Sequence, residues 1–226
     1  MLISPPFGGG RAPVLARNAV ASSQPLATQA GIEALQKGGN AVDAALATAI
    51  TLTVVEPTMN GLGGDGFAIV WDGKKLHGLN ASGCAPAAWT PEFFSGKSEM
   101  DLIGWNTVTV PGMISGWVEL SKKFGKLPFA SLFQRAIDYA KNGFPVSPVI
   151  ARQWREAIPI LKNQPGFSES FLIEGKAPQA GHIWKYPAQA ETLQDIAQTT
   201  GESFYQGALA QQMVRFSKTT GGCFTL

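Results

Sequence analysis

The 226-residue chain contains only two cysteines and two histidines, and this scarcity limits the kinds of site it can build. Cys84 and Cys223 lie far apart in no CxxC or CxxH pattern, and His77 and His182 are equally isolated. Metal sites and thiol-redox pairs need such residues at close spacing, so the sequence predicts neither. Both cysteines are expected to be buried packing residues, and a Ser-His-Asp triad has no support.

An excess of one charge sign is also lacking. The 18 basic and 16 acidic residues give a net charge of +2 and form no basic stripe, so a nucleic-acid partner is not expected. No apolar run reaches the ~20 residues that a membrane span needs. The longest, residues 41–55, is interrupted by Asp43 and three threonines, and we expect a buried helix there and no membrane partner.

The N-terminus is broken by Pro5, Pro6 and three consecutive glycines before any apolar run reaches the length of a signal peptide. The sequence as written therefore predicts a cytoplasmic protein. An upstream start would allow a periplasmic or secreted one instead.

Hydrophobic residues make up 45% of the chain, enough for one large core, and caps and breakers mark the helices. Ser22 or Ser23 is expected to cap a first helix that ends at Gly38. Asn40 is expected to cap the next one, which runs to Val55, and residues 67–80 read as a β-hairpin that turns at Asp72-Gly73. Further helices are predicted over residues 113–124, 129–142, 149–157, 188–200 and 207–220, and a long surface loop with one short strand over residues 159–186.

The stretch GLGGDG, residues 61–66, fits the G-x-G-x-x-G spacing of dinucleotide-binding turns. Such a turn must follow a strand and open a helix, whereas this one follows a predicted helix and precedes a predicted strand, so NAD binding is not expected. A dinucleotide-dependent oxidoreductase would require measurable NAD binding. The glycines of this stretch permit positive φ angles and close backbone approach. Two interpretations stay open: a compact helix-to-strand turn, or a turn that lines a binding site.

Several blocks, in the same order, resemble the N-terminal part of the γ-glutamyltransferases and their acylase relatives. The resemblance extends from about Val20 to Leu226. The blocks are GGNAVDAA (residues 38–45), GLGGDGF (61–67), LNASGCAP (79–86), TVPGMISGW (109–117), GFPVS (143–147) and FYQG (204–207).

This resemblance implies an N-terminal-nucleophile hydrolase with an αββα sandwich, an α/β (α+β) fold of which residues 1–226 form a single, largely helical and incomplete N-terminal part. In the family a precursor cleaves itself, and the Thr at the new amino terminus attacks a γ-glutamyl or other acyl amide. The nucleophile is expected beyond Leu226, so this chain is expected to carry no catalytic residue, to need the C-terminal segment as its partner and to be inactive alone. No metal or organic cofactor is implied.

One position departs from the pattern. The transferases have a segment of the form D-x-R-E-x-A-P whose Arg binds the substrate α-carboxylate, and here residues 80–86 read NASGCAP, with Ser82 in place of the Arg. Arg offers a charged, bidentate fork and Ser one neutral hydroxyl, so the change indicates an acylase acting on a glutaryl-type or other non-glutamyl group. Two alternatives stay open: Ser82 only makes a strand-end turn, or the protein is a non-catalytic binding module of the same fold.

The candidate substrate-binding residues are thus Asn80, Ser82 and Gly83, together with Asp65 of the glycine turn. Asp65 would either hold a substrate amine or only accept hydrogen bonds from nearby backbone N–H groups.

Overall fold

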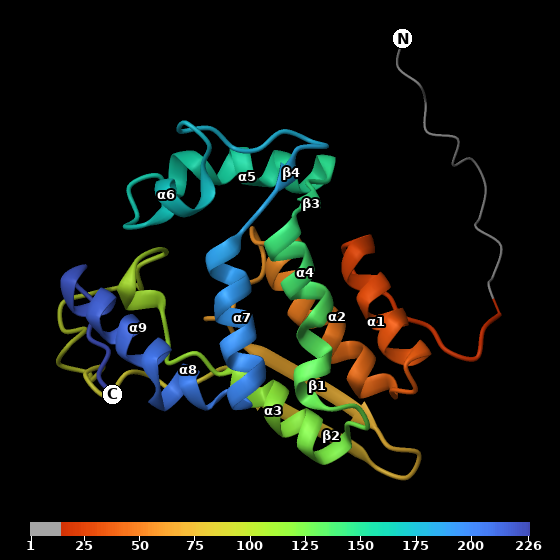
Figure 1. Cartoon of the computed structure of the whole chain (residues 1–226). Coiled ribbons are helices and arrows are strands. Elements are labelled where there is room, and N and C mark those ends of the chain that lie inside the picture. Colours follow the sequence, from red (N-terminus) through yellow and green to blue (C-terminus); the bar gives the residue numbers. More distant parts are fainter. Residues whose placement is uncertain (1–14) are drawn as a thin grey trace.

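The computed structural model describes residues 15–226, and helices make up most of the regular structure there (Figure 1). This confirms the largely helical α+β class. The α-helices are α1 (Pro25–Gln36), α2 (Ala41–Val55), α3 (Met113–Phe124), α4 (Gln134–Asn142), α5 (Pro148–Leu161), α6 (Phe167–Phe171), α7 (Pro187–Thr199), α8 (Glu202–Gln206) and α9 (Ala208–Thr219). Short 3-10 helices are η1 (Trp105–Thr107) and η2 (Phe129–Phe133), and the strands are β1 (Gly66–Trp71), β2 (Leu76–Ala81), β3 (Phe144–Pro145) and β4 (Ile183–Trp184).

Helix α2 runs through the middle of the molecule, packed against α1, α3 and α4 (Figure 1). Eleven of its 15 residues are buried, among them Ile50, Val54 and Val55, which confirms the predicted buried helix. A helix that is apolar on nearly every side needs such a central position. No helix between residues 15 and 226 has the length and apolar character needed to cross a membrane.

The start of α2 is capped as predicted. The Asn40 side chain accepts hydrogen bonds from the N–H groups of Val42 and Asp43, and the Asp43 carboxylate accepts one from the Asn40 N–H at 2.8 Å. Asp43 is fully buried and also accepts from the N–H groups of Lys126 and Leu127, just after α3. One side chain therefore joins the start of α2 to the end of α3.

The cap of α1 was predicted at the wrong residue. Gln24, not Ser22 or Ser23, accepts the hydrogen bond from the Leu26 N–H. The two serines are used elsewhere: Ser22 donates to the Gln24 carbonyl, and Ser23 donates to the buried carboxylate of Glu56 at 2.6 Å. The bond of Ser22 belongs to a turn and the bond of Ser23 is a tertiary contact, and rules for helix starts consider neither.

The second half follows the prediction with local differences. Residues 129–142 divide into η2 and α4, and α5 continues through Pro159 to Leu161. The expected loop at 159–186 contains the predicted short strand, β4, but also the unpredicted helix α6. Helix α8 was missed because it is only five residues long and lies between two glycines, Gly201 and Gly207.

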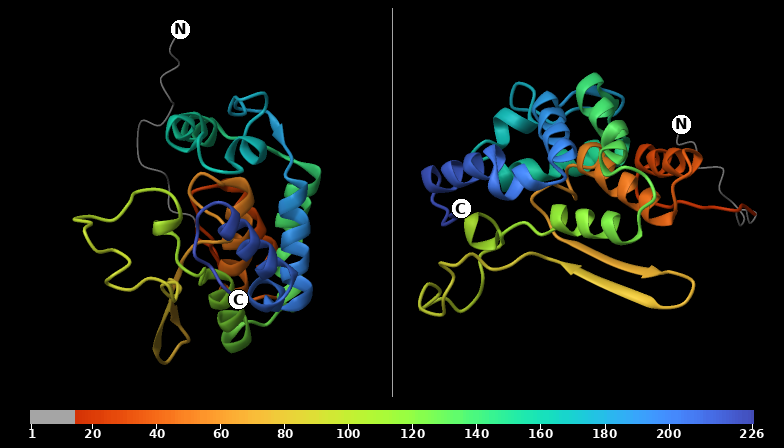
Figure 2. Two further views of the ribbon diagram at one scale, coloured as in Figure 1. Left: turned by 90° about the vertical axis from the view of Figure 1, so that its left-hand side faces the viewer. Right: turned by 60° about the horizontal axis from the view of Figure 1, so that its bottom comes forward.

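The β1–β2 hairpin lies along α3, and its opposite face is uncovered (Figure 2, right). The uncovered face carries Phe67, Ile69, Trp71 and Leu76, each more than 60% exposed. A second, separate sheet pairs β3 with β4. Residues 15–226 thus form the helices and two separate two-stranded sheets, and the stacked sheets of a complete sandwich are not formed within them.

Candidate substrate-binding site

The open end of the hairpin brings the sequence-predicted residues together. Gly66 pairs with Ala81 and Phe67 pairs with Asn80, in antiparallel register. Asp65 directly precedes Gly66 and Ser82 directly follows Ala81, so both residues lie just beyond the paired strands, at the same end of the hairpin. Antiparallel pairing therefore brings residues 65 and 82, which are 17 positions apart in the sequence, to one end of the hairpin.

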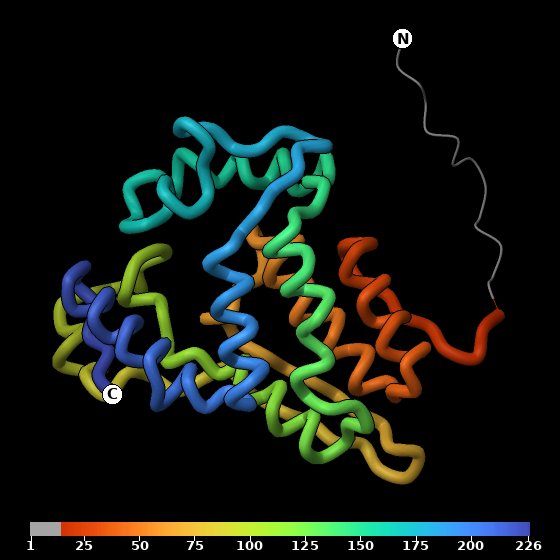
Figure 3. The backbone as a smooth tube through the Cα atoms, in the orientation of Figure 1, coloured from red at the N-terminus to blue at the C-terminus, as the bar shows by residue number. Residues whose placement is uncertain are grey.

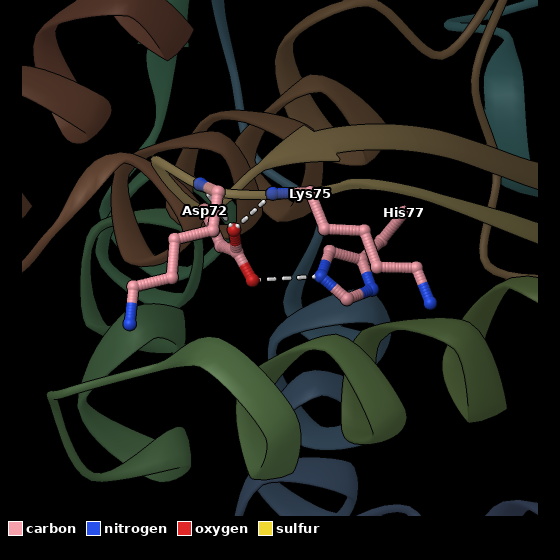
Figure 4. A network of polar contacts seen from close by, with 4 residues as sticks. Asp72, Lys75 and His77 are labelled. Atoms are coloured by element: carbon pink, nitrogen blue, oxygen red, sulfur yellow. Dashed lines mark hydrogen bonds and ion pairs between the residues drawn. The ribbon is translucent and has the colours of Figure 1, made fainter.

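The closed end of the hairpin sets this register. The predicted turn is confirmed: Gly73 has a φ of +92°, and the Asp72 N–H donates to the Lys75 carbonyl. The Asp72 carboxylate accepts hydrogen bonds from the N–H groups of Lys74 and Lys75 and from His77 Nε2, each at 2.8 Å (Figure 4). These bonds, that from His77 first, lower the pKa of Asp72 from 3.8 to about 2.

Residues 80–84, which we call the substrate segment, comprise the last two residues of β2 and the three residues that follow it. The Ser82 N–H donates to Asn80 Oδ1 at 3.0 Å, and the Ser82 carbonyl accepts from the Thr109 hydroxyl at 3.2 Å. The local turn is thus made by the Asn80 side chain and the Ser82 backbone. Among the described residues, the Ser82 hydroxyl forms no hydrogen bond and remains available to a ligand.

A second segment, residues 109–113, crosses the substrate segment at very close range. Gly83 has a φ of +83°, and a Cβ atom there would lie 1.8 Å from the Val110 carbonyl oxygen. A Cβ on Gly112 would lie 2.3 Å from the Ala81 carbonyl oxygen. Both positions require glycine because backbone atoms occupy the space of the side chain.

The glycine turn, residues 61–66, does not use the positive φ angles that its glycines permit; all four have other conformations. Close packing affects Gly64 most, whereas Gly61 and Gly63 have room for a Cβ atom. A Cβ on Gly64 would lie 3.2 Å from the Gly61 carbonyl oxygen, and Gly66 packs beneath Met113. The Met113 N–H donates to the Gly64 carbonyl at 3.2 Å, so the turn is held against the start of α3.

The site has almost no charge. Its three segments, residues 60–66, 80–86 and 109–113, contain no Lys, Arg or His. Their only carboxylate, Asp65, is exposed and takes part in no ion pair of the described chain. No group of three His, Cys, Asp or Glu residues within residues 15–226 could hold a metal ion.

Cys84 corrects the expectation that both cysteines are buried. It is exposed in the substrate segment, and Cys223 is half-buried. The Cys84 carbonyl accepts from the Val110 N–H at 2.9 Å, so the backbone of this residue is fixed while its thiol faces solvent.

Two parts of the site were not predicted. Residues 109–113 and Tyr205, which hydrogen-bonds to them, lie in the TVPGMISGW and FYQG blocks. Both blocks contribute to the family resemblance, but a sequence block alone does not predict which residues it contacts in the folded protein. The glycine at position 112 was the one available signal of close backbone contact.

The fold and the sequence blocks together identify the protein family. Residues 27–226 match the gamma-glutamyltranspeptidase family, and the chain belongs to that family. Its fold is the N-terminal part of the N-terminal-nucleophile hydrolase fold of γ-glutamyltransferases and acylases.

The chain is similar to particular members of the family. It is 39% identical over 210 residues to the glutathione hydrolase-like YwrD proenzyme of Bacillus subtilis, covering 92% of this chain and 40% of that protein. It is 38% identical to the oxamate amidohydrolase proenzyme of Klebsiella pneumoniae, covering 89% and 39%. The cephalosporin acylase structure from Bacillus halodurans superposes with a TM-score of 0.84 at 44% identity, covering 97% and 44%. The chain thus spans about two fifths of the length of these relatives.

Proposed function

We propose that the complete protein is an amidase or acyltransferase of the γ-glutamyltransferase type, and that this chain supplies part of its acyl-binding site. A Thr or Ser hydroxyl on a further C-terminal part attacks the amide carbonyl, with its own α-amine as the base, and forms an acyl-enzyme. Backbone N–H groups stabilise the oxyanion of the tetrahedral intermediate. Water or an acceptor amine then takes the acyl group.

The observation that carries the substrate proposal is the absence of a cation from the three site segments. A substrate carboxylate held beside Ser82 would meet one neutral hydroxyl and the negative charge of Asp65. Replacing a charged, bidentate Arg contact by a neutral one costs about 1.5–3 kcal/mol, or roughly tenfold to hundredfold in affinity. A glutaryl group keeps a terminal carboxylate, so the site favours an acyl chain whose distal end is uncharged over both glutaryl and γ-glutamyl groups.

The uncovered hairpin face supports the need for a further part. Phe67, Ile69 and Trp71 form an apolar strip on an edge strand without a single charged residue or proline. Beside that strand lies an apolar groove of about 420 Å³ between β1, α2 and α3. Soluble proteins rarely leave such a surface uncovered, and the relatives are about two and a half times as long as the matched region.

The Ser82→Arg substitution in the complete protein tests the substrate proposal. Three anilides with the same five-carbon acyl chain serve as substrates: pentanoyl, with no distal charge; glutaryl, with a carboxylate; and γ-glutamyl, with a carboxylate and an amine. We expect the wild type to prefer pentanoyl. Ser82→Arg should raise kcat/KM for the glutaryl and γ-glutamyl anilides by roughly tenfold to hundredfold.

Ser168→Arg is the matched control, because it adds the same charge on the exposed surface of α6. It should leave the ranking of the three substrates unchanged. An unchanged kcat/KM for the charged anilides in Ser82→Arg would show that residue 82 does not face the distal end of the acyl group.

A further inference from the structure

We propose that Tyr205 is a positioning residue that holds the substrate segment in place through a single hydroxyl group. This inference rests on the proposed function, because it concerns the segment that would bind the acyl group. Tyr205 itself is not expected to touch the substrate.

Residues 109–113, which we call the clamp segment, connect the two halves of the site. They bond to both halves: Val110 N–H donates to the Cys84 carbonyl at 2.9 Å, the Thr109 hydroxyl donates to the Ser82 carbonyl, and Met113 N–H donates to the Gly64 carbonyl. Any displacement of the clamp segment is therefore passed to the substrate segment and to the glycine turn together.

The clamp segment and the substrate segment are in direct backbone contact. Gly83 and Gly112 cross so closely that neither has room for a Cβ atom. Packed atoms at this range cannot slide past one another without a clash. The position of the clamp segment thus fixes the position of Ser82 and Cys84.

Tyr205 holds the clamp segment on the side away from the substrate segment. The Tyr205 hydroxyl donates to the Pro111 carbonyl at 2.8 Å and accepts from the Ser115 N–H at 3.0 Å. Ser115 is in the first turn of α3, where N–H groups have no partner within the helix. The N-cap residue of α3 is Gly112, which has no side chain to cap them. Tyr205, 90 residues further along the chain, supplies this bond.

The packing of helix α8 fixes the position of Tyr205. It lies on α8, between Gly201, which has a φ of +82°, and Gly207, where a Cβ would lie 2.7 Å from Ser203 Cα. The neighbouring Phe204 is buried, and α8 packs against both α7 and α9. The Tyr205 hydroxyl therefore links α8 to the clamp segment, and through it to the substrate segment. The backbone trace shows α8 beside the start of α3 (Figure 3).

The test is Tyr205→Phe in the complete protein, which removes the hydroxyl and keeps the ring. Hydrogen exchange at Val110 and Met113 should become faster, although neither amide bonds to Tyr205 directly. With the preferred anilide, KM should rise about tenfold, because a displaced substrate segment loses contacts to the substrate worth about one ordinary hydrogen bond, while kcat changes little. A merely structural loss would lower the active fraction, and so reduce kcat at unchanged KM.

Tyr139→Phe is the matched control. It makes the same chemical change on α4, beneath Arg135 and away from the clamp segment, and should alter neither exchange at the two amides nor KM. Thr109→Val is the second variant in case Tyr205→Phe does not fold. It removes the hydrogen bond from the Thr109 hydroxyl to the Ser82 carbonyl, which joins the clamp segment to the substrate segment, and should also raise KM.

The outcomes separate this inference from the proposed function. Unchanged exchange at Val110 and Met113 in a folded Tyr205→Phe protein overturns the positioning role, whatever the activity. Faster exchange with an unchanged KM overturns the link to substrate binding. If the complete protein hydrolyses none of the anilides, the proposed function fails, and the exchange measurement alone still tests the structural coupling.

Discussion

Gly83 shows how one residue can be required for two separate reasons. Its φ of +83° favours glycine, and backbone atoms of Val110 occupy the space of a Cβ. Gly73, in the hairpin turn, has a similar φ of +92° but nothing within 4 Å of its Cβ position. The two glycines therefore separate the conformational cost of a side chain from its steric cost.

We predict that Gly83→Ala lowers the free energy of unfolding by about 3 kcal/mol or more, and that Gly73→Ala lowers it by only about 1 kcal/mol. Urea denaturation of both variants measures the difference. Equal losses would mean that residues 109–113 move aside easily, against the close crossing described above.

The positions of Asn80, Ser82 and Asp65 illustrate what the sequence predicts at this scale. Two short apolar segments joined at Asp72-Gly73 were enough to predict a hairpin. Its pairing places Asn80 opposite Phe67, with Asp65 and Ser82 just beyond the paired residues at the same end. The partner of Ser82 could not be predicted, because Thr109 is 27 residues away and joins it only through the tertiary fold. The burial of Cys84 was predicted wrongly for the same reason, since residue type alone does not reveal which side of a turn faces solvent.

At the scale of elements, the hairpin depends on its turn, and the turn depends on an ionised Asp72. Its pKa is lowered to about 2 in the folded protein, from an ordinary value of 3.8. A carboxyl whose folded pKa is lower than its unfolded pKa stabilises the fold above the unfolded value, and this contribution disappears as the pH falls through the folded value.

We therefore predict that Asp72→Asn lowers the thermal stability by a constant amount above about pH 4, and that the difference from the wild type shrinks between about pH 4 and pH 2. Melting temperatures of both proteins measured from pH 6 to pH 2 provide the test. A difference that stays constant down to pH 2 would show that the hydrogen bonds of Asp72 do not depend on its charge.

Elements with local signals were predicted well, and elements without them were not. The cap formed by Asn40 and Asp43 is a contact between neighbours in sequence, so α2 was predicted with its correct start. Helix α8 and the bonds of Tyr205 have no such signal, because a five-residue helix is held by its packing rather than by its own propensity. The clamp segment belongs to the same group.

At the scale of the whole molecule, the hairpin leaves an apolar face exposed, and the chain matches about two fifths of the length of longer relatives. Two of those relatives are named proenzymes. The family resemblance indicated the fold class and the candidate residues Asn80, Ser82, Gly83 and Asp65, whereas caps, breakers and periodicity indicated only individual helices and the hairpin. Neither source could give the acyl group, which depends on surfaces that this chain only partly forms.

The most direct test is a time course of intact mass and amidase activity on the complete protein, with residues 1–226 alone as a control. We predict one polypeptide that becomes two, the second beginning with Thr or Ser, and anilide hydrolysis that grows in proportion to cleavage, while the control stays inactive. Hydrolysis at the full rate by an uncleaved polypeptide or by residues 1–226 alone, or a protein that neither cleaves nor hydrolyses any of the three anilides, would contradict the account.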